Sequence, residues 1–186
     1  MSSFLHYVLL LITITTTLLP TYTAGAFSED LFSAIITTRM AKTTHLHFYF
    51  HDILSGKNPS AKKVIGSGQG LPVFGDAYMI DDMLTEGQEM DSKVIGKAQG
   101  MYAMATKHDI AFLMVINYEF VEGKYNGSSV SILGRNPVMR DVREMPIVGG
   151  SGIFRFAKGY ALAHTVWFDP NTGDATVEYN VYVQHF

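Results

Sequence analysis

Asp52 is the residue of this chain best placed for proton-transfer chemistry. It follows a segment in which Leu46, Phe48 and Phe50 alternate with polar side chains, the pattern of a β-strand with two different faces. Because Asp52 shares the parity of these apolar residues, a continuous strand would place its carboxyl group on their face. Burial beside aromatic rings raises a carboxyl pKa, so such a group could donate or accept a proton. The alternative is an aspartate that caps the turn at residues 53–56.

Arg143 is the second candidate, and its neighbours leave its role open. It lies between Val142 and Glu144 in a segment bounded by proline and glycine residues. An arginine in such a loop is typically an exposed side chain or an ion-pair partner, here of Glu144. A binding role needs further support from the pattern around it.

Three histidines, His45, His47 and His51, have the even spacing that puts them on one strand face. A His-x-His pair on a β-strand can bind a metal ion, but the carboxylate and distal histidine that would complete such a site do not follow. We interpret them as outer or interfacial residues. The chain also has no nucleophile elbow, phosphate-binding loop or nucleotide fingerprint. We therefore expect no metal, no cofactor and no oxidative centre of its own.

The composition predicts one globular domain. The chain has 186 residues, of which 47% are hydrophobic and 17% charged. Its net charge is −3 and its lysines and arginines are scattered, which argues against a nucleic-acid partner. It contains no cysteine, so disulfides and thiol chemistry are excluded and stability must come from core burial.

The N-terminus has the sequence pattern of a targeting signal. An apolar, threonine-rich run over residues 7–19 is ended by Pro20, and Ala24-Gly25-Ala26 is typical of a signal-peptidase site. The run is shorter than the roughly 20 residues of a transmembrane helix. We therefore predict a signal peptide over 1–26 and secretion without a stable membrane anchor. Residues 27–44, which lack a clean period, are predicted to be an N-terminal arm.

The rest of the chain alternates with a period of two. Such runs cover about residues 45–52, 112–120, 154–168 and 175–184, separated by turn sequences at 123–127, 136–137, 149–152 and 170–173. Many short strands with turns between them predict an antiparallel barrel or sandwich. Periodicity alone does not choose between the two.

The order of motifs resembles the dirigent family of plant secreted proteins. The resemblance rests on His47–Leu54, Phe74-Gly75 through Asp81-Asp82, Gly96–Tyr102, the segment Tyr125–Tyr160 with its Gly-x-Asn-Pro turn and Gly-Gly-x-Gly hinge, and Val177–Val183. It covers nearly the whole chain after about residue 45. It implies an all-β fold, an eight-stranded antiparallel (calycin-like) barrel over 45–186, which self-associates as a dimer or trimer in the extracellular space (apoplast).

The resemblance also selects site residues. In lignan-forming relatives the aspartate matching Asp52 lies in the pocket, and Arg143 matches the family's arginine. Its planar donors suit a phenolic oxygen, and pairing with it would keep Asp52 ionised. Tyr102, whose hydroxyl suits a phenolic ring, completes the expected catalytic set. The expected substrate-binding residues are Phe48, Phe50, Asn136 and Asp82.

Two positions depart from the family pattern. Asn136 replaces an aspartate, and an amide cannot act as a general acid or base, which puts a mechanism with those paired carboxylates in doubt. Met83 stands where proline is common after the paired aspartates. For Asp81 and Asp82, a position at the pocket mouth and a solvated turn are equally compatible with the sequence. Asn126-Gly127-Ser128 is a glycosylation sequon on a predicted turn, so Asn126 is expected to carry a glycan.

The resemblance implies a protein that directs stereochemistry. A separate oxidase such as laccase would make phenoxy radicals from monolignols such as coniferyl alcohol, and the barrel would fix which faces couple to give an optically active lignan. The alternative is a pterocarpan-synthase-like dehydratase that closes a ring through a quinone methide. Coupling of naphthol-type phenols and a binding module without selective chemistry remain further possibilities.

Overall fold

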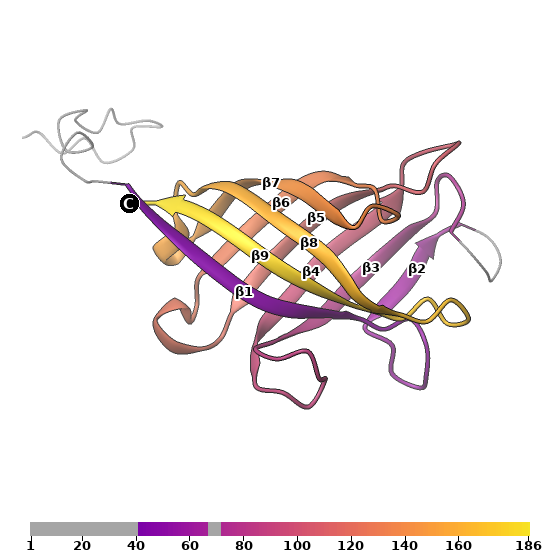
Figure 1. Cartoon of the computed structure of the whole chain (residues 1–186), viewed down its shortest axis with the longest axis horizontal. Helices are drawn as coiled ribbons and strands as arrows, with labels where there is room; N and C mark the ends of the chain where they lie inside the picture. Colours follow the sequence, from indigo (N-terminus) through magenta and orange to yellow (C-terminus); the bar gives the residue numbers. More distant parts are fainter. Residues whose placement is uncertain (1–40, 67–71) are drawn as a thin grey trace, which may run out of the picture. The chain divides into compact units, whose positions relative to one another are not determined.

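The computed structural model describes residues 41–66 and 72–186, which form an antiparallel β-barrel (Figure 1). Its strands are β1 (Lys42–Asp52), β2 (Ala61–Ile65), β3 (Ala77–Thr85), β4 (Val94–Met104), β5 (Phe112–Phe120), β6 (Ser129–Asn136), β7 (Val142–Ser151), β8 (Lys158–Phe168) and β9 (Ala175–His185). Two short 3₁₀ helices, η2 (Gly123–Tyr125) and η3 (Gly152–Phe154), lie between strands. The predicted signal peptide and nearly all of the predicted arm lie outside the described residues.

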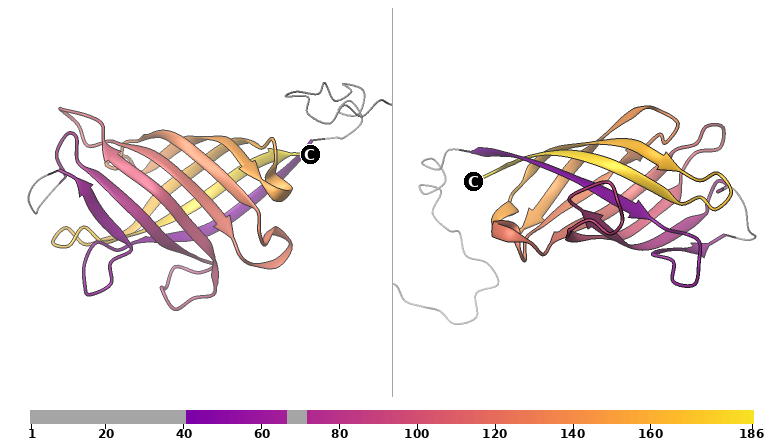
Figure 2. Two further views of the ribbon diagram at one scale, coloured as in Figure 1. Left: turned by 180° about the vertical axis from the view of Figure 1, so that it is seen from behind. Right: turned by 60° about the horizontal axis from the view of Figure 1, so that its bottom comes forward.

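Eight of these strands close into a barrel. From β3 to β9 each strand pairs antiparallel with the next, and β9 pairs with β1 along the whole length of both (Figures 1 and 2). The closing pair, β1 with β3, spans only Tyr49–His51 against Met83–Thr85. Strand β2 pairs with the other half of β3 and adds a short ninth strand at that edge. The predicted eight-stranded antiparallel barrel is therefore confirmed.

Strand alternation fills the barrel interior. In β5 the inward residues Met114, Ile116, Tyr118 and Phe120 are buried, whereas Val115 and its outward neighbours are exposed. This is the two-faced pattern that the sequence predicts for residues 112–120. The interior is packed with aromatic and aliphatic side chains from all eight barrel strands.

Two glycines allow neighbouring strands to approach closely. Gly100 in β4 and Gly159 in β8 both have positive φ, at +152° and +145°. A Cβ atom at either position would overlap a carbonyl oxygen of the adjacent strand, Val115 O or Tyr182 O. Glycine is needed at both points because no side chain fits between the strands.

Three local features differ from the sequence prediction. Strand β1 begins at Lys42, before the predicted domain start at 45, because residues 42–44 already pair with β9. The glycines at 149–150 continue β7 and do not form a turn. The alternation predicted from residue 154 is interrupted, because η3 follows β7 and Phe156 is exposed with a φ of +62°. β8 begins only at Lys158.

No helix among the described residues is long and apolar enough to span a membrane.

Candidate active site

Two carboxyl groups point into the barrel near its β1–β3 closure. Asp52 ends β1 on the inward face, as its parity predicts, and Asp82 lies on the inward face of β3, where it is fully buried. The Ser60 hydroxyl donates a hydrogen bond to Asp82 Oδ1 at 2.5 Å. Asp52 Oδ1 and Asp82 Oδ2 are both inaccessible and have no hydrogen-bond partner. An ionised carboxylate would be poorly stabilised by so few donors.

Both carboxyl groups consequently favour the neutral form. Burial raises the pKa of Asp52 to about 7, against the lowering effect of the Tyr102 hydroxyl and with a further increase from Asp174. Burial and the neighbouring charge of Asp52 raise the pKa of Asp82 to about 8, which the Ser60 hydrogen bond partly offsets. Because the two groups interact, they titrate as a pair. The pair can therefore hold protons at neutral and mildly acidic pH.

Tyr102 and Tyr78 form an aromatic wall beside this pair. They face each other across β3 and β4 and stack with their ring centroids 4.9 Å apart. Both side chains are buried, and burial raises the pKa of each hydroxyl. In Tyr102 the nearby Asp52 charge raises the pKa further. Both hydroxyls are thus neutral donors at physiological pH.

Arg143 points into the barrel but does not pair with Asp52. Its Nε donates to Asn136 Oδ1 at 3.2 Å and an Nη donates to the backbone oxygen of Asp141 at 3.4 Å. The side chain is 3% exposed, whereas Glu144 faces solvent, so the surface interpretation and the Glu144 pairing are both wrong. Burial lowers its pKa from the usual arginine value. The expected pairing of Arg143 with Asp52 is also wrong, because its side chain donates to Asn136 and Asp141 instead.

Aromatic rings connect the carboxyl pair with Arg143. Phe48 lies edge-on to Tyr118 at 5.2 Å and stacks on Tyr179 at 5.7 Å, and Phe50 packs on Tyr179 at 5.8 Å. Burial raises the pKa of Tyr179, and the charges of Arg143, Asp52 and Asp82 also act on it, so the ring lies within electrostatic reach of all three. Tyr118 is fully buried and lies edge-on to Tyr179, with their ring centroids 5.4 Å apart. The interior therefore offers aromatic surface with hydroxyl, guanidinium and carboxyl groups at separate points.

Four residues of the site were not among the predicted candidates: Tyr78, Tyr118, Tyr179 and Ser60. The parity of their strands identifies the three tyrosines as inward residues, because each alternates in phase with buried apolar positions. For Ser60 no such signal exists, since it reaches Asp82 from the connection between β1 and β2.

Several candidates lie on the outside of the barrel. Asp81 points away from the interior and binds Lys97 Nζ at 3.1 Å, so only Asp82 of the pair belongs to the site. His45 and His47 face outward, as predicted, and bind Asn180 and Glu178. His51 is also on the outer face, buried between Thr85 and Thr176. Asn126 is exposed in the β5–β6 connection.

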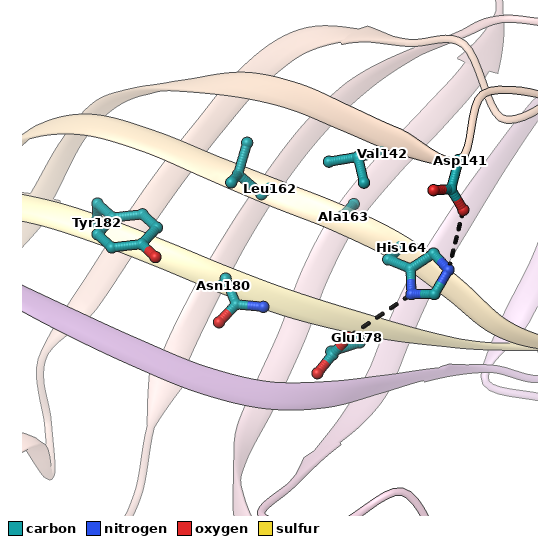
Figure 3. A pocket seen from close by; sticks show the side chains of 8 residues that line it. All are labelled: Asp141, Val142, Leu162, Ala163, His164, Glu178, Asn180 and Tyr182. Atoms are coloured by element: carbon teal, nitrogen blue, oxygen red, sulfur yellow. Dashed lines mark ion pairs between the residues drawn. The ribbon is translucent and has the colours of Figure 1, made fainter.

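A hollow on the outer face of β7, β8 and β9 is separate from this site. His164 occupies it, with Asp141 at 3.1 Å and Glu178 at 3.7 Å (Figure 3). These side chains lie on the opposite face of the sheet from the carboxyl pair, so the hollow does not extend the interior site.

Comparison with known proteins agrees with this architecture. The family model described as dirigent-like protein matches residues 43–184. Dirigent protein 7 of Arabidopsis thaliana is 51% identical over 148 residues, 80% of each chain, and pterocarpan synthase 1 of Glycine max is 43% identical over 87% of this chain and 89% of its own. The solved structure of the pterocarpan synthase dirigent protein PsPTS1 superposes with a TM-score of 0.74 at 50% identity, covering 78% of this chain and 96% of that one. By its sequence and its barrel, the chain belongs to the dirigent family.

Proposed function

We propose that this barrel binds a reactive intermediate derived from a phenol and fixes the stereochemistry of the bond that it forms. The leading substrates are phenoxy radicals of monolignols such as coniferyl alcohol, made by a separate oxidase such as laccase and coupled here to an optically active lignan. The observation that carries this proposal is the pair of carboxyl groups, Asp52 and Asp82, whose burial among aromatic rings inside the barrel raises their pKa values.

The carboxyl pair suits the step that follows radical coupling. Joining two such radicals through their side chains gives quinone methides, each with a carbonyl oxygen and an electrophilic side-chain carbon. When a hydroxyl group adds to that carbon, the carbonyl oxygen takes up a proton and becomes a phenol, while the hydroxyl loses its proton. A neutral Asp52 can donate the first proton, and the Asp52 carboxylate that remains can accept the second from the adding hydroxyl. The protons then balance, and Asp52 ends the step in its original neutral form.

The remaining side chains suit orientation. Tyr102 and Arg143 present donors that can bind phenolic oxygens, and Phe48 and Phe50 present apolar surface to the rings. Asn136 lies against Arg143 and can orient a ligand through its amide without exchanging a proton. Only a modest bias is needed, since about 1.4 kcal/mol between two approach geometries changes their ratio tenfold.

A dehydratase is the second candidate function. Two solved pterocarpan synthase dirigent proteins are 47% and 50% identical to this chain. The same neutral Asp52 could protonate a leaving hydroxyl while the conjugated phenol gives up its proton, which releases water and a quinone methide. A second phenol on the molecule would then close the ring, losing its proton while the quinone methide oxygen takes one up. This reaction needs no oxidant.

Chiral chromatography distinguishes the two functions. Coniferyl alcohol is incubated with a one-electron oxidant, with and without the purified protein, beside an oxidant-free incubation with a 2′-hydroxyisoflavanol. An excess of one lignan enantiomer that depends on the protein supports radical coupling. Racemic lignans in the first incubation together with pterocarpan in the second would exclude radical coupling and support the dehydratase function. Racemic lignans without pterocarpan would exclude both substrate assignments.

Family membership and the exposed position of Asn126 support an extracellular glycoprotein. A glycan at this site would project from the β5–β6 connection into solvent, because the asparagine is exposed. Ser128 of the same sequon is buried and accepts a hydrogen bond from the Ile153 amide.

The outer face of the barrel supports self-association as a dimer or trimer. Met79, Met101, Val115 and Leu133 lie directly opposite one another across β3, β4, β5 and β6. All four point outward, and Met79, Val115 and Leu133 are 50%, 39% and 48% exposed. A continuous apolar row of this kind is typical of a contact with another protein, for which we propose a second copy of this chain.

Leu133→Lys is expected to convert the assembly to monomers, because a lysine in the middle of an apolar contact must be desolvated without a partner. Light scattering after size-exclusion chromatography measures the mass. Thr43→Lys adds the same charge on the outer face of β1 and is the control, which should leave the assembly unchanged. An oligomer that persists in Leu133→Lys would exclude this row as the interface.

A further inference from the structure

Asp174 fixes the segment that directly follows Asp52. It lies in the β8–β9 connection and is 8% exposed. Its Oδ1 accepts hydrogen bonds from the backbone amides of Leu54, at 2.8 Å, and Ser55, at 3.0 Å. Its Oδ2 accepts a third from the Ser55 hydroxyl at 2.5 Å. One carboxylate therefore ties together two connections that are far apart in the sequence.

The contact is next to the candidate acid. Asp52 pairs with Ala175 in the β1–β9 register, so Asp174 lies immediately before the residue opposite Asp52. Leu54, which Asp174 holds through its amide, packs against the buried core. Backbone hydrogen bonds also hold the turn that carries Asp174. The Asp169 amide donates to the Asp174 carbonyl oxygen, and the Gly173 amide donates to the Asp169 carbonyl oxygen. Asp52 is thus held on both sides, by the pairing of β1 with β9 at Ala175 and by the hydrogen bonds of Asp174 to the backbone of residues 54 and 55.

We propose that Asp174 is a positioning residue for the reaction at Asp52. Its carboxylate holds the backbone after Asp52 against the β8–β9 connection through the three hydrogen bonds to Leu54 and Ser55 (the Asp174 clip), and so fixes where the Asp52 carboxyl group lies. The chemical part of this inference rests on the proposed function, whereas the clip itself is a property of the folded chain. Asp174 touches no group that reacts in that proposal, and its effect passes through Asp52.

Charge gives Asp174 a second effect on the same group. Tyr102 from β4 and Asp174 act on the Asp52 pKa. The titratable groups on which Asp52 acts in turn are Asp82 and Tyr78 from β3 and Tyr179 from β9. Among the influences on the Asp52 pKa, burial is the largest, and Asp174 raises the pKa further. The clip and the charge can be separated, because an asparagine retains an oxygen for the two backbone amides but carries no charge.

Hydrogen exchange tests the clip without any substrate. In Asp174→Ala the amides of Leu54 and Ser55 lose their acceptor, and we expect both to exchange at least about tenfold faster than in the unchanged protein. In Asp174→Asn they should remain protected. Ser55→Ala removes only the hydroxyl contact and should leave the Leu54 amide protected. If both amides stay protected in Asp174→Ala while the barrel remains folded, the clip is wrong.

The positioning role is tested by titrating Asp52 and by measuring the products. NMR of the carboxyl carbons should show a lower Asp52 pKa in Asp174→Asn, because the like charge is gone. In Asp174→Ala the enantiomeric excess should fall. In Asp174→Asn it should be retained, but as the pH is raised it should begin to decline at a lower pH than in the unchanged protein. An Asp52 pKa that is the same in all three proteins, or full selectivity in Asp174→Ala, overturns the role. Failure of the proposed function would give a different result. None of the three proteins would then act on the phenols, but the hydrogen-exchange difference at the Leu54 and Ser55 amides would still be observed.

Discussion

Replacing Asp52 with asparagine should abolish stereochemical control while leaving the barrel folded. The amide has nearly the same shape as the neutral carboxyl group but cannot supply a proton to a quinone methide oxygen. Loss of a general acid typically lowers a rate by about 10² to 10⁴-fold. Quinone methides that are not protonated would remain in the barrel, and further radicals would couple in free solution without stereochemical control. Chiral chromatography should therefore find close to racemic lignan from Asp52→Asn, or, for the dehydratase, no pterocarpan above the uncatalysed level.

The pH dependence should change in the same variant. Since the Asp52 pKa is about 7, the proton needed for catalysis is present below that pH and is lost as the pH rises through it. Selectivity of the unchanged protein should fall over this range, whereas the residual reaction of Asp52→Asn should not respond. Asp81→Asn is the matched control, because Asp81 faces solvent beside Lys97 and should retain full selectivity. Unchanged product from Asp52→Asn would remove Asp52 from the mechanism.

The barrel could be predicted because its determinants are local and repetitive. Alternation in β1, β5 and β9 identifies the inward face, and the turn residues at 123–127 and 170–173 mark where the chain reverses. The prediction failed around residues 149–157, where apolar residues continue but β7 runs through two glycines and is followed by η3. A periodic sequence alone does not distinguish a helical turn from a strand of the same length.

The site was predictable only in part. Parity placed Asp52 inside the barrel, and the same reasoning applied to Tyr78, Ile80 and Leu84 would have separated Asp82 from Asp81. The partners of Arg143 and of Ser60 depend on how the barrel closes and on the path of a connection. Neither set of contacts produces a periodic pattern in the sequence. The raised pKa of the carboxyl pair has the same origin, since it depends on what surrounds two groups from strands that meet only at the closure.

Asp82 should make the folded protein less stable as the pH rises. Its pKa is about 8 in the barrel and close to 3.8 when the chain is unfolded. Between these values the unfolded chain releases a proton that the folded chain keeps, so the free energy of unfolding decreases with increasing pH. The contribution of Asp82 to the free energy of unfolding is fully present below about pH 4, and it is lost as the pH rises through about 8. Each pKa unit corresponds to about 1.4 kcal/mol, so the change amounts to several kcal/mol.

Urea unfolding at pH 5 and pH 8.5 measures this effect, and Asp82→Asn should reduce the difference. The asparagine oxygen can still accept the Ser60 hydrogen bond, but no proton is exchanged at this position. Because the pKa of Asp82 is raised partly by Asp52, the variant should also relieve the Asp52 carboxyl group and lower its pKa. Asp81→Asn, on the outer face, should keep the pH dependence of the unchanged protein. If Asp82→Asn retained that dependence as well, Asp82 would be ionised in the folded barrel, and a neutral acid pair could not be the source of the proton in either proposed reaction.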